Sequence, residues 1–345
     1  MDEETLKKKL EEDKKDVEGM IQKFNEEVQR FFSAIENDKE NLYVFSTKGI
    51  GDFIIAGGLS YAVQNRKGKK STILVIQDTK WDTGILFPNV TGIISCPKDF
   101  VLMLNKHFKT TENYEGDNYI YAGIRKHNDE YIWDEDLNML ERYKKDALKI
   151  PLDTPFNYPI IDEISADNAT ALQEKYILDK ERTIILLPRA KTFENLTPEF
   201  WEEVAQRLKE KNYIVYTNVA GDEKPVKGTE PLKVSFVELY YLTDKVKLFI
   251  GTNSGVFIFL AMTDAKTINV TPFPHWYWDI SFMFPECNNR TLYDTTKYDS
   301  DMKSILGEYD VAAKVKYSHE KIPQENIFNS HAEIIDEILK EVEKI

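Results

Sequence analysis

The chain has 345 residues, of which 42% are hydrophobic and 12% aromatic, so it can bury a substantial core, and its length suits two α/β domains better than one. The formal net charge of −14 argues against nucleic-acid binding, because a phosphate-binding face would have to form against the overall field. Cys96 and Cys287 form no CxxC pair or Cys/His cluster, which argues against a disulfide framework and a structural zinc site. With no long apolar run and a charged start, we expect a cytoplasmic protein without a signal peptide or membrane span.

Residues 1–36 are rich in Lys and Glu, and their apolar positions recur at helical spacing. The pattern predicts an amphipathic helix or helix pair that lies on the domain or on a partner subunit, and it leaves open a peripheral contact with a membrane or with a second copy. The apolar positions are Leu6, Leu10, Val17, Ile21, Phe24, Val28, Phe31 and Phe32. We take residues 1–40 as an N-terminal helical extension.

The first half alternates short apolar runs with helix-compatible runs. The expected elements are a strand at 42–45, a glycine turn at 46–52, helices at 53–63 and 81–87, and strands at 71–77 and 92–95. This alternation predicts a doubly wound parallel sheet, which we assign to a domain of residues 41–160. The turn contains Gly49 and Gly51 but neither the third glycine of a dinucleotide fingerprint nor the Lys-Ser/Thr of a phosphate-binding Walker loop.

Residues 98–150 give no clear pattern of helices and strands. They hold an aromatic group that either borders an acceptor cleft or anchors an irregular subdomain. Its members are Tyr114, Tyr119, Tyr121, His127, Tyr131 and Trp133. Pro151, Pro155 and Pro159 then follow in quick succession, which is typical of a linker between domains.

A second alternating series begins after this linker. Thr197 and Pro198 mark a helix start, since threonine caps helices and proline suits the first helical position. The expected elements are helices at 167–176, 198–211, 236–243, 256–262 and 330–344, strands at 182–188, 213–217, 246–250 and 267–270, and an aromatic loop at 271–278. We assign residues 161–325 to a second domain and 326–345 to a C-terminal helix.

The stretch from Lys245 to Val270 reads as a strand, a small-residue turn, a helix and the next parallel strand. Ligands of open α/β sheets lie beyond the carboxyl ends of the strands, so the turn from Gly251 to Gly255 is placed to hold a phosphate. The alternative is that Asn253 or Ser254 only caps the helix.

Five sequence segments occur in an order that is typical of a known family. They are STKGIGDFIIAGGLSYAV in the first half, then ILLPRAK, TPEFWEEVAQRL, AGDE and FIGTNSGVFIFLA in the second. This ordered set, spread over roughly residues 41–275, resembles the GT-B glycosyltransferases, most nearly the heptosyltransferase-like glycosyltransferase family 9. The resemblance implies two Rossmann-like domains facing a cleft, the first for the acceptor and the second for a nucleotide-sugar donor. It also implies sugar transfer to a glycan, lipid or protein acceptor.

Three positions depart from that family's pattern. Asn253 stands where the family has Asp before Ser/Thr-Gly, Ile258 stands where it has His, and the family's proline after Gly-Asp is absent. Heptose specificity is therefore not carried over. Two other interpretations stay open, namely another GT-B sugar-nucleotide enzyme such as an epimerase, and a non-catalytic scaffold or partner subunit.

Glycosyl transfer needs a base for the acceptor hydroxyl and a group that stabilises the leaving diphosphate. Asp52 matches the family's proposed base, although it could instead only cap the next helix. The diphosphate would be met by Arg189 and Lys191, which could also be ordinary surface charges. It would also be met by the turn with its helix N-terminus. The residues of this turn are Thr252, Asn253, Ser254 and Gly255.

Further donor or acceptor contacts are expected at scattered positions. These are Lys48, Gly49, Gly51, Glu223, His275 and Trp276. The alternative for His275 is a packing role beside its aromatic neighbours. Cationic side chains and backbone amides can replace a metal ion at a diphosphate, so we predict neither a metal nor a cofactor. Asp299-Ser300-Asp301 has the letters of a metal-binding DxD motif but lies in a polar segment.

Overall fold

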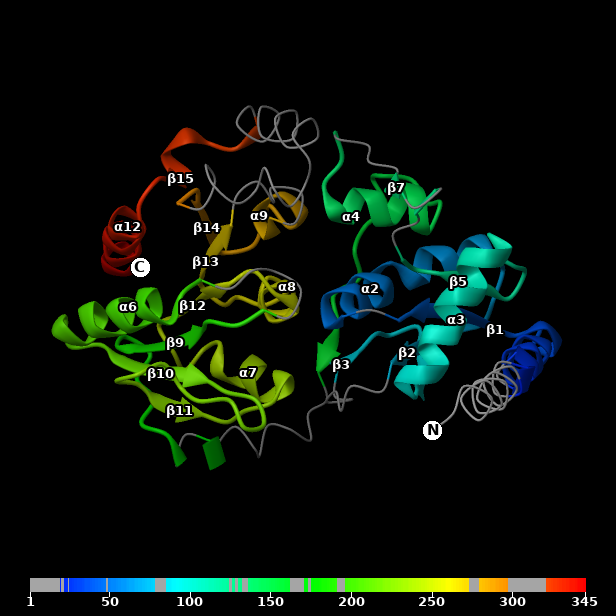
Figure 1. Ribbon diagram of the computed structural model, residues 1–345, viewed down its shortest axis with the longest axis horizontal. Coiled ribbons are helices and arrows are strands. Elements are labelled where there is room, and N and C mark those ends of the chain that lie inside the picture. The colour runs from blue at the N-terminus through cyan, green and yellow to red at the C-terminus, as the bar shows by residue number, and fades with distance from the viewer. Residues whose placement is uncertain are drawn as a thin grey trace, which may run out of the picture. The chain divides into compact units, whose positions relative to one another are not determined.

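A computed structural model describes residues 19, 22–23, 25–47, 49–77, 85–123, 126–127, 130–131, 136–161, 171–172, 175–190, 196–272, 279–296 and 321–345. The chain forms two compact units (Figure 1). Unit 1 takes the described residues of Met1–Trp81, Phe87–Tyr131 and Tyr143–Asn157, and unit 2 takes those of Asp82–Leu86, Ile132–Arg142 and Tyr158–Ile345. The chain therefore passes from one unit to the other several times.

Unit 1 is built on a parallel sheet of four strands. They are β1 (Asn41–Ser46), β2 (Ser71–Gln77), β4 (Val90–Cys96) and β5 (Tyr119–Tyr121). Their order in the sheet is β4-β2-β1-β5, so the chain builds outward from β1 in one direction and then returns to add β5 on the other side. In sheets of this kind the crevice at the carboxyl ends, where the order reverses, is where ligands bind. Here that point lies between β1 and β5.

Helices cover both faces of this sheet. The helix α2 (Ile50–Arg66) covers one face, and α3 (Lys98–Thr111) packs with a helical segment, residues 25–37, on the other. The second layer is held by Val28, Phe32, Ile35, Phe45, Leu104 and Phe108, which belong to one buried cluster. Residues 25–37 thus carry part of the expected apolar stripe into the core. Most of the preceding residues lie outside the described part of the chain, so a helix over 1–36 stays a prediction.

Two expectations for this half need correction. The predicted helix at 81–87 is wrong over its described residues, because Ile85–Leu86 forms the strand β3, which pairs antiparallel with β8 (Ile160–Ile161) in unit 2. Gly84 and Pro88 flank these two residues and oppose a helix of that length. The helix α3 was missed, although Val101, Leu104 and Phe108 show the helical spacing of its buried face.

The aromatic group of residues 114–133 divides between described and undescribed side chains. Tyr119 and Tyr121 are buried in the core cluster, and Tyr114 packs against it. For these three residues the anchoring interpretation is correct. Lys126–His127 (β6) and Glu130–Tyr131 (β7) form a small antiparallel pair, and the side chains of His127, Tyr131 and Trp133 lie outside the described part of the structure.

Unit 2 is built on a parallel sheet of seven strands in the order β11-β10-β9-β12-β13-β14-β15. The strands are β9 (Thr183–Leu187), β10 (Ile214–Asn218), β11 (Glu230–Leu232), β12 (Leu248–Thr252), β13 (Thr267–Pro272), β14 (Asn289–Asp294) and β15 (Ile327–Phe328). Their order reverses between β9 and β12, which is the arrangement of the Rossmann fold. The predicted strands of this half are confirmed within two residues at either end, and β11, β14 and β15 were not predicted.

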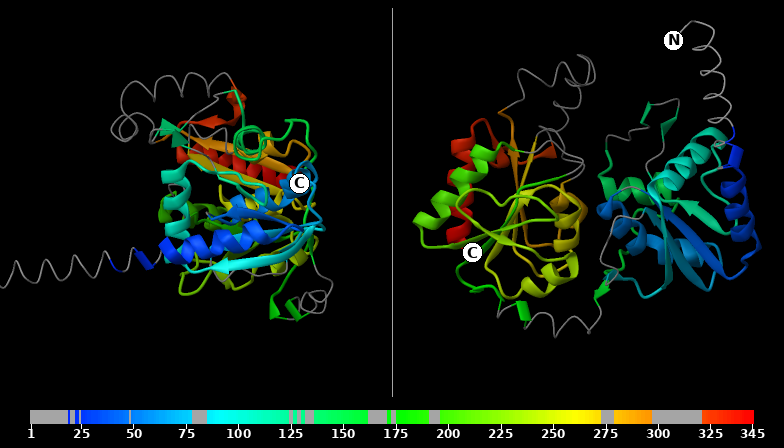
Figure 2. Two further views of the ribbon diagram at one scale, coloured as in Figure 1. Left: turned by 90° about the vertical axis from the view of Figure 1, so that its right-hand side faces the viewer. Right: turned by 60° about the horizontal axis from the view of Figure 1, so that its bottom comes forward.

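The helices α6 (Pro198–Glu210) and α12 (His331–Lys344) cover one face of this sheet, as the right-hand view of Figure 2 shows. The expected cap is confirmed, since the hydroxyl of Thr197 accepts a hydrogen bond from the Phe200 amide at 3.3 Å. The other face carries α7 (Phe236–Leu242), α8 (Gly255–Leu260) and α9 (Ile280–Met283). The predicted helix at 167–176 lies largely outside the described residues.

Short helical turns complete the described chain. They are α4 (Met139–Arg142), the π-helical turn η1 (Tyr143–Ala147) and the 3₁₀ turn η4 (Gln324–Asn326). Among the residues that the structure describes, no helix combines the length and apolar character needed to cross a membrane.

Candidate functional site

Asp52 lies in the first turn of α2, directly beyond the carboxyl end of β1. Gly49 is the N-cap residue, and its amide donates a hydrogen bond to Oδ2 of Asp52 at 3.1 Å. The side chain therefore caps the helix, as the simpler interpretation predicts. This carboxylate also stands at the point where the strand order of the unit 1 sheet reverses, so capping and a role at a ligand site are compatible.

The second oxygen of Asp52 has a partner that sequence reasoning missed. The hydroxyl of Tyr143, a fully buried residue, donates a hydrogen bond to Oδ1 of Asp52. Burial, together with the Asp52 charge and this bond, raises the pKa of Tyr143 well above 10. The two residues are 91 positions apart in the chain, and Tyr143 falls in a region without a clear pattern, so no local signal could have identified it.

Further polar groups gather at the same edge of unit 1. The hydroxyls of Thr47 and Tyr121 both donate to Oδ1 of Asn105, at 2.7 and 3.2 Å. Thr47 follows β1, Tyr121 ends β5, and Asn105 belongs to α3. These bonds tie the two strand ends to a helix, which fixes the backbone from which the glycine turn departs.

In unit 2, Arg189 follows β9 and reaches the loop that follows β10. Its guanidinium donates to the carbonyl of Lys224 and lies 3.5 Å from a carboxylate oxygen of Glu223. Glu223 also accepts from the amide of Ala220 at 3.1 Å. Both charged side chains are 39% exposed, and an arginine has five N–H donors. Arg189 can therefore hold this loop and still present donors to an anion.

The turn after β12 is packed tightly against the end of β9. A β-carbon on Gly251 would lie 2.2 Å from the carbonyl oxygen of Leu187, so only glycine allows these strands to approach in this way. The side chains of Thr252 and Asn253 are buried, and the Thr252 hydroxyl donates to the carbonyl of Pro188 at 3.5 Å. Their contacts with a ligand would thus come from the backbone.

The helix that follows is shorter than expected and begins at Gly255, with Ser254 as its N-cap residue. Because it has six residues, its macrodipole contributes little, and any attraction for a phosphate at this turn would come from the turn's amides. The hydroxyl of Ser254 is buried and makes no hydrogen bond among the described residues.

Beneath this turn, β13 carries polar side chains into the interior. Asn269 and Thr271 are fully buried, and in the described part of the chain neither the Asn269 amide nor the Thr271 hydroxyl makes a hydrogen bond. Buried polar groups are nearly always paired in proteins, and a buried water would satisfy these atoms without a ligand. The alternation in TINVT was the available signal.

Several of the predicted contact residues lie outside the described part of the chain, and their roles stay predictions. They are Lys48, Lys191, His275 and Trp276. Gly51 is buried in the first turn of α2. No group of three or more His, Cys, Asp or Glu within the described ranges is arranged to hold a metal ion.

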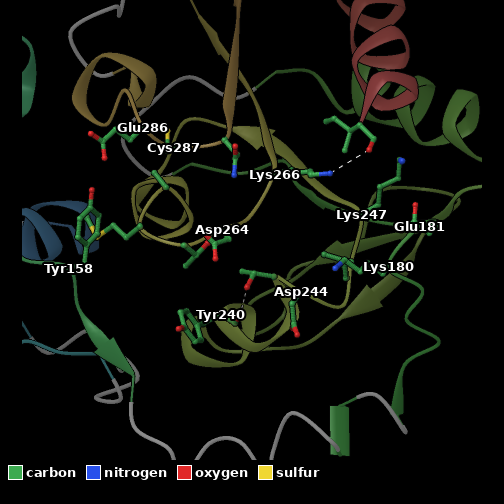
Figure 3. Close-up of a pocket in the computed structure, with 17 residues that line it drawn as sticks. Tyr158, Lys180, Glu181, Tyr240, Asp244, Lys247, Asp264, Lys266, Glu286 and Cys287 are labelled. Atoms are coloured by element: carbon green, nitrogen blue, oxygen red, sulfur yellow. Dashed lines mark hydrogen bonds between the residues drawn. The ribbon is translucent and has the colours of Figure 1, made fainter.

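A cavity of about 700 Å³ lies elsewhere in unit 2 (Figure 3). It is lined by residues that precede β9, β12, β13 and β14, including Lys180, Lys247, Lys266 and Cys287. Lysines there alternate with Glu181, Asp244, Asp264 and Glu286. It therefore opens at the amino-terminal edge of the sheet, opposite the edge that carries Arg189 and the turn after β12.

The likeness of this chain to known proteins is one of structure. No family model matches the sequence, and no curated protein matches it. A family 9 glycosyltransferase from Veillonella parvula superposes with a TM-score of 0.55 at 13% identity, over 89% of this chain and 97% of that one. The chain therefore has a GT-B fold. The GT-B resemblance inferred from the sequence is confirmed at the level of the fold, including two parallel sheets.

Two other GT-B structures align with TM-scores below 0.5, so the fold assignment rests on the first. The ADP-heptose lipopolysaccharide heptosyltransferase II of E. coli gives 0.49 at 14% identity, over 82% of this chain and 100% of that one. The Arabidopsis thaliana enzyme UGT89C1, solved with UDP-L-rhamnose, gives 0.40 at 10% identity, over 88% and 99%.

Proposed function

We propose that this protein is a glycosyltransferase that moves a sugar from a nucleotide-diphosphate sugar to a hydroxyl of a glycan, lipid-linked or protein acceptor. The observation that carries the proposal is the position of the two predicted sites in their own sheets. Asp52 follows β1 and Arg189 follows β9, and these are the strands at which the two sheets reverse their order. A GT-B fold hosts this chemistry, which makes the fold an argument by analogy.

In this proposal unit 2 binds the donor. Arg189, with Lys191 and the amides of residues 252–255, stabilises the diphosphate as negative charge develops on it during transfer. Glu223, held by Arg189 and the Ala220 amide, offers a carboxylate that can accept hydrogen bonds from sugar hydroxyls. These groups act without a metal ion or another cofactor.

Asp52 is the proposed base. A carboxylate at a strand end can remove the proton from an acceptor hydroxyl as that hydroxyl attacks the sugar. Its two hydrogen bonds leave lone pairs on both oxygens, because an ionised carboxylate has about four acceptor sites. The neighbouring Lys48, Gly49 and Gly51 would border the acceptor. We place the enzyme in the cytoplasm, where the free thiols of Cys96 and Cys287 would persist.

A second candidate is a non-catalytic subunit that retains the fold. It is favoured by Ile258, which is buried in α8 where the resembling family has a histidine. A GT-B sugar-nucleotide epimerase is a further alternative, and it would need additional acid and base residues.

The test is a thermal-shift screen of the full chain against UDP-, GDP-, ADP- and CMP-sugars and the free nucleotides. We expect at least one nucleotide to stabilise the protein. Arg189→Ala should weaken that binding by roughly 10–150-fold, because a hydrogen bond to a charged group contributes about 1.5–3 kcal/mol.

Arg182→Ala is the matched control. Arg182 stands at the other end of β9 and also donates to a backbone carbonyl, that of Asn212. Its loss should leave nucleotide affinity unchanged. Stabilisation by no nucleotide would refute the enzyme and favour the scaffold, and equal losses in the two arginine variants would refute the donor site. Transfer and hydrolysis assays then separate a transferase from an epimerase.

A further inference from the structure

We propose that Tyr143 is a positioning residue that holds the Asp52 carboxylate in one orientation for proton removal. The role rests on the proposed function, since Asp52 is its base. Both residues belong to unit 1.

The first argument is the way in which the carboxylate is held. Oδ2 accepts from the Gly49 amide of its own helix, and Oδ1 accepts from Tyr143, a residue far along the chain. One bond alone would let the carboxyl group turn about its last side-chain torsion, which is broad for aspartate. Two donors on different elements fix that torsion. A base of fixed orientation keeps its free lone pairs directed at one position, where the acceptor hydroxyl must lie.

The second argument is that Tyr143 is itself immobile. Its side chain is fully buried, and it opens the π-helical turn η1, a feature that occurs often at functional sites. The end of this turn is anchored by the Leu148 amide, which donates to the Tyr143 carbonyl at 2.8 Å. Lys144 adds a second anchor, because its ammonium donates to the carbonyl of Leu152 at 2.8 Å. The phenol is therefore a fixed donor.

The third argument comes from comparison with another tyrosine–aspartate bond in unit 1. Tyr43 donates to Asp38 at 2.8 Å, but these residues are five positions apart and flank the amino end of β1. That bond closes a local turn, together with bonds from Asn41 and Glu40 to the same carboxylate. The bond from Tyr143 joins distant segments at the carboxyl end of the same strand, where the proposed chemistry occurs.

The test uses Tyr143→Phe in the full chain, with the donor found by the nucleotide screen and steady-state transfer or donor hydrolysis as the readout. Phenylalanine keeps the ring and removes the donor. We expect kcat to fall roughly 10–100-fold through loss of orientation, while KM for the donor stays within a few-fold of wild type. Tyr43→Phe is the matched control and should leave kcat unchanged.

The double variant decides whether Tyr143 acts through Asp52. If it does, Tyr143→Phe should cost no further activity in an Asp52→Asn background, because the group that it orients is already lost. Both proteins are assayed well below their unfolding midpoints, so that a stability change does not enter kcat. A multiplicative loss in the double variant, or wild-type kcat in Tyr143→Phe, overturns the inference while the transferase stands.

A measurement without substrate distinguishes failure of the positioning role from failure of the proposed function. A cycle of Tyr143→Phe with Asp52→Ala, which unlike asparagine keeps no partner for the phenol, is read by denaturant unfolding and should show coupling between Tyr143 and Asp52. The same cycle with Tyr43→Phe should show none. Additive unfolding free energies would show that the two side chains do not interact, and this would refute the inference. A wild-type chain that turns over no donor but shows the coupling would refute the proposed function, and the positioning role with it, and leave the hydrogen bond as a structural contact.

Discussion

The ring of Phe156 fills the place that a β-carbon on Gly58 would take, with its nearest ring atom 2.1 Å from that position. The backbone next to this ring also contacts the helix, since the amide of Asn157 donates to the carbonyl of Gly58 at 2.9 Å. At the adjacent Gly57, the nearest ring atom of Phe87 lies 2.1 Å from the position that a β-carbon would take. Two glycines in the middle of a helix should weaken it, but here they leave the space in which two aromatic rings pack.

This pair predicts that Gly57→Ala destabilises the protein more than Gly58→Ala does. Phe87 is 2% exposed and cannot move aside, so overpacking should cost about 1–3 kcal/mol. Phe156 is half-buried and can swing away, which leaves the better helix propensity of alanine to offset part of the cost. Denaturant unfolding of both variants measures the difference, and the reverse order would contradict it.

A similar comparison applies to the strand glycines Gly251 and Gly92. Gly251→Ala would place a β-carbon 2.2 Å from the backbone oxygen of Leu187, whereas in Gly92→Ala the nearest atom, on Ile73, is 3.8 Å away. Backbone in a central strand cannot give way, so Gly251→Ala should lose about 1–3 kcal/mol of stability and weaken nucleotide binding. Gly92→Ala should be neutral or slightly stabilising. Equal unfolding midpoints would show that the β9–β12 approach is not tight.

Asp52→Asn separates catalysis from capping. Asparagine can still accept from the Gly49 amide, and the Tyr143 hydroxyl can turn to accept from its amide group, so folding and donor affinity should stay near wild type. Loss of the proton acceptor should lower turnover by roughly 10²–10⁴-fold. Glu238→Gln is the control, because Glu238 occupies the same capping-box position in α7 and glutamine keeps that cap, so both folding and turnover should stay near wild type. Turnover within a few-fold of wild type in Asp52→Asn would exclude it as the base.

The turn before β1 predicts an acid dependence of stability. Hydrogen bonds from the Asn41 side chain, from Tyr43 and from two backbone amides lower the pKa of Asp38 from 3.8 to about 2. A carboxyl group with a lowered folded pKa contributes stability that is fully present above its unfolded pKa, here about 3.8, and is lost as the pH falls through about 2. Asp38→Asn should therefore cost up to about 1 kcal/mol at neutral pH, given its solvent exposure, and nothing at the acid end of that window. A cost that is constant with pH would contradict this.

The sequence was most informative where a signal is local. The cap at Thr197 and Pro198 and the glycine turns after β1 and β12 were predicted because capping and turn chemistry act over a few residues. The helix α8 was predicted too long by its apolar continuation. Ile85–Leu86 was assigned to a helix because a strand of two residues forms only through pairing with its partner. That partner, β8, begins about 75 residues further along the chain.

In the candidate site, too, local signals predicted some residues, and contacts between distant residues were missed. Asp52 and Arg189 were identified from their place after apolar strands, since strand ends meet at one edge of a parallel sheet. Tyr143 and the Lys224 carbonyl, which complete their surroundings, are contacts across 91 and 35 residues. Such contacts depend on the packed sheet and helices, and no spacing in the sequence encodes them.

The repeated passage of the chain between the two units has a consequence for any attempt to take the protein apart. A cut in the proline-rich segment after Pro151 would leave Ile85–Leu86 without β8, and Asn138 without the Phe282 carbonyl to which it donates at 3.0 Å. Neither half of the gene encodes one whole unit. Exchange of the second half of the chain between two proteins of this fold by a single crossover would thus transfer an incomplete unit, and a functional hybrid would require several coordinated junctions.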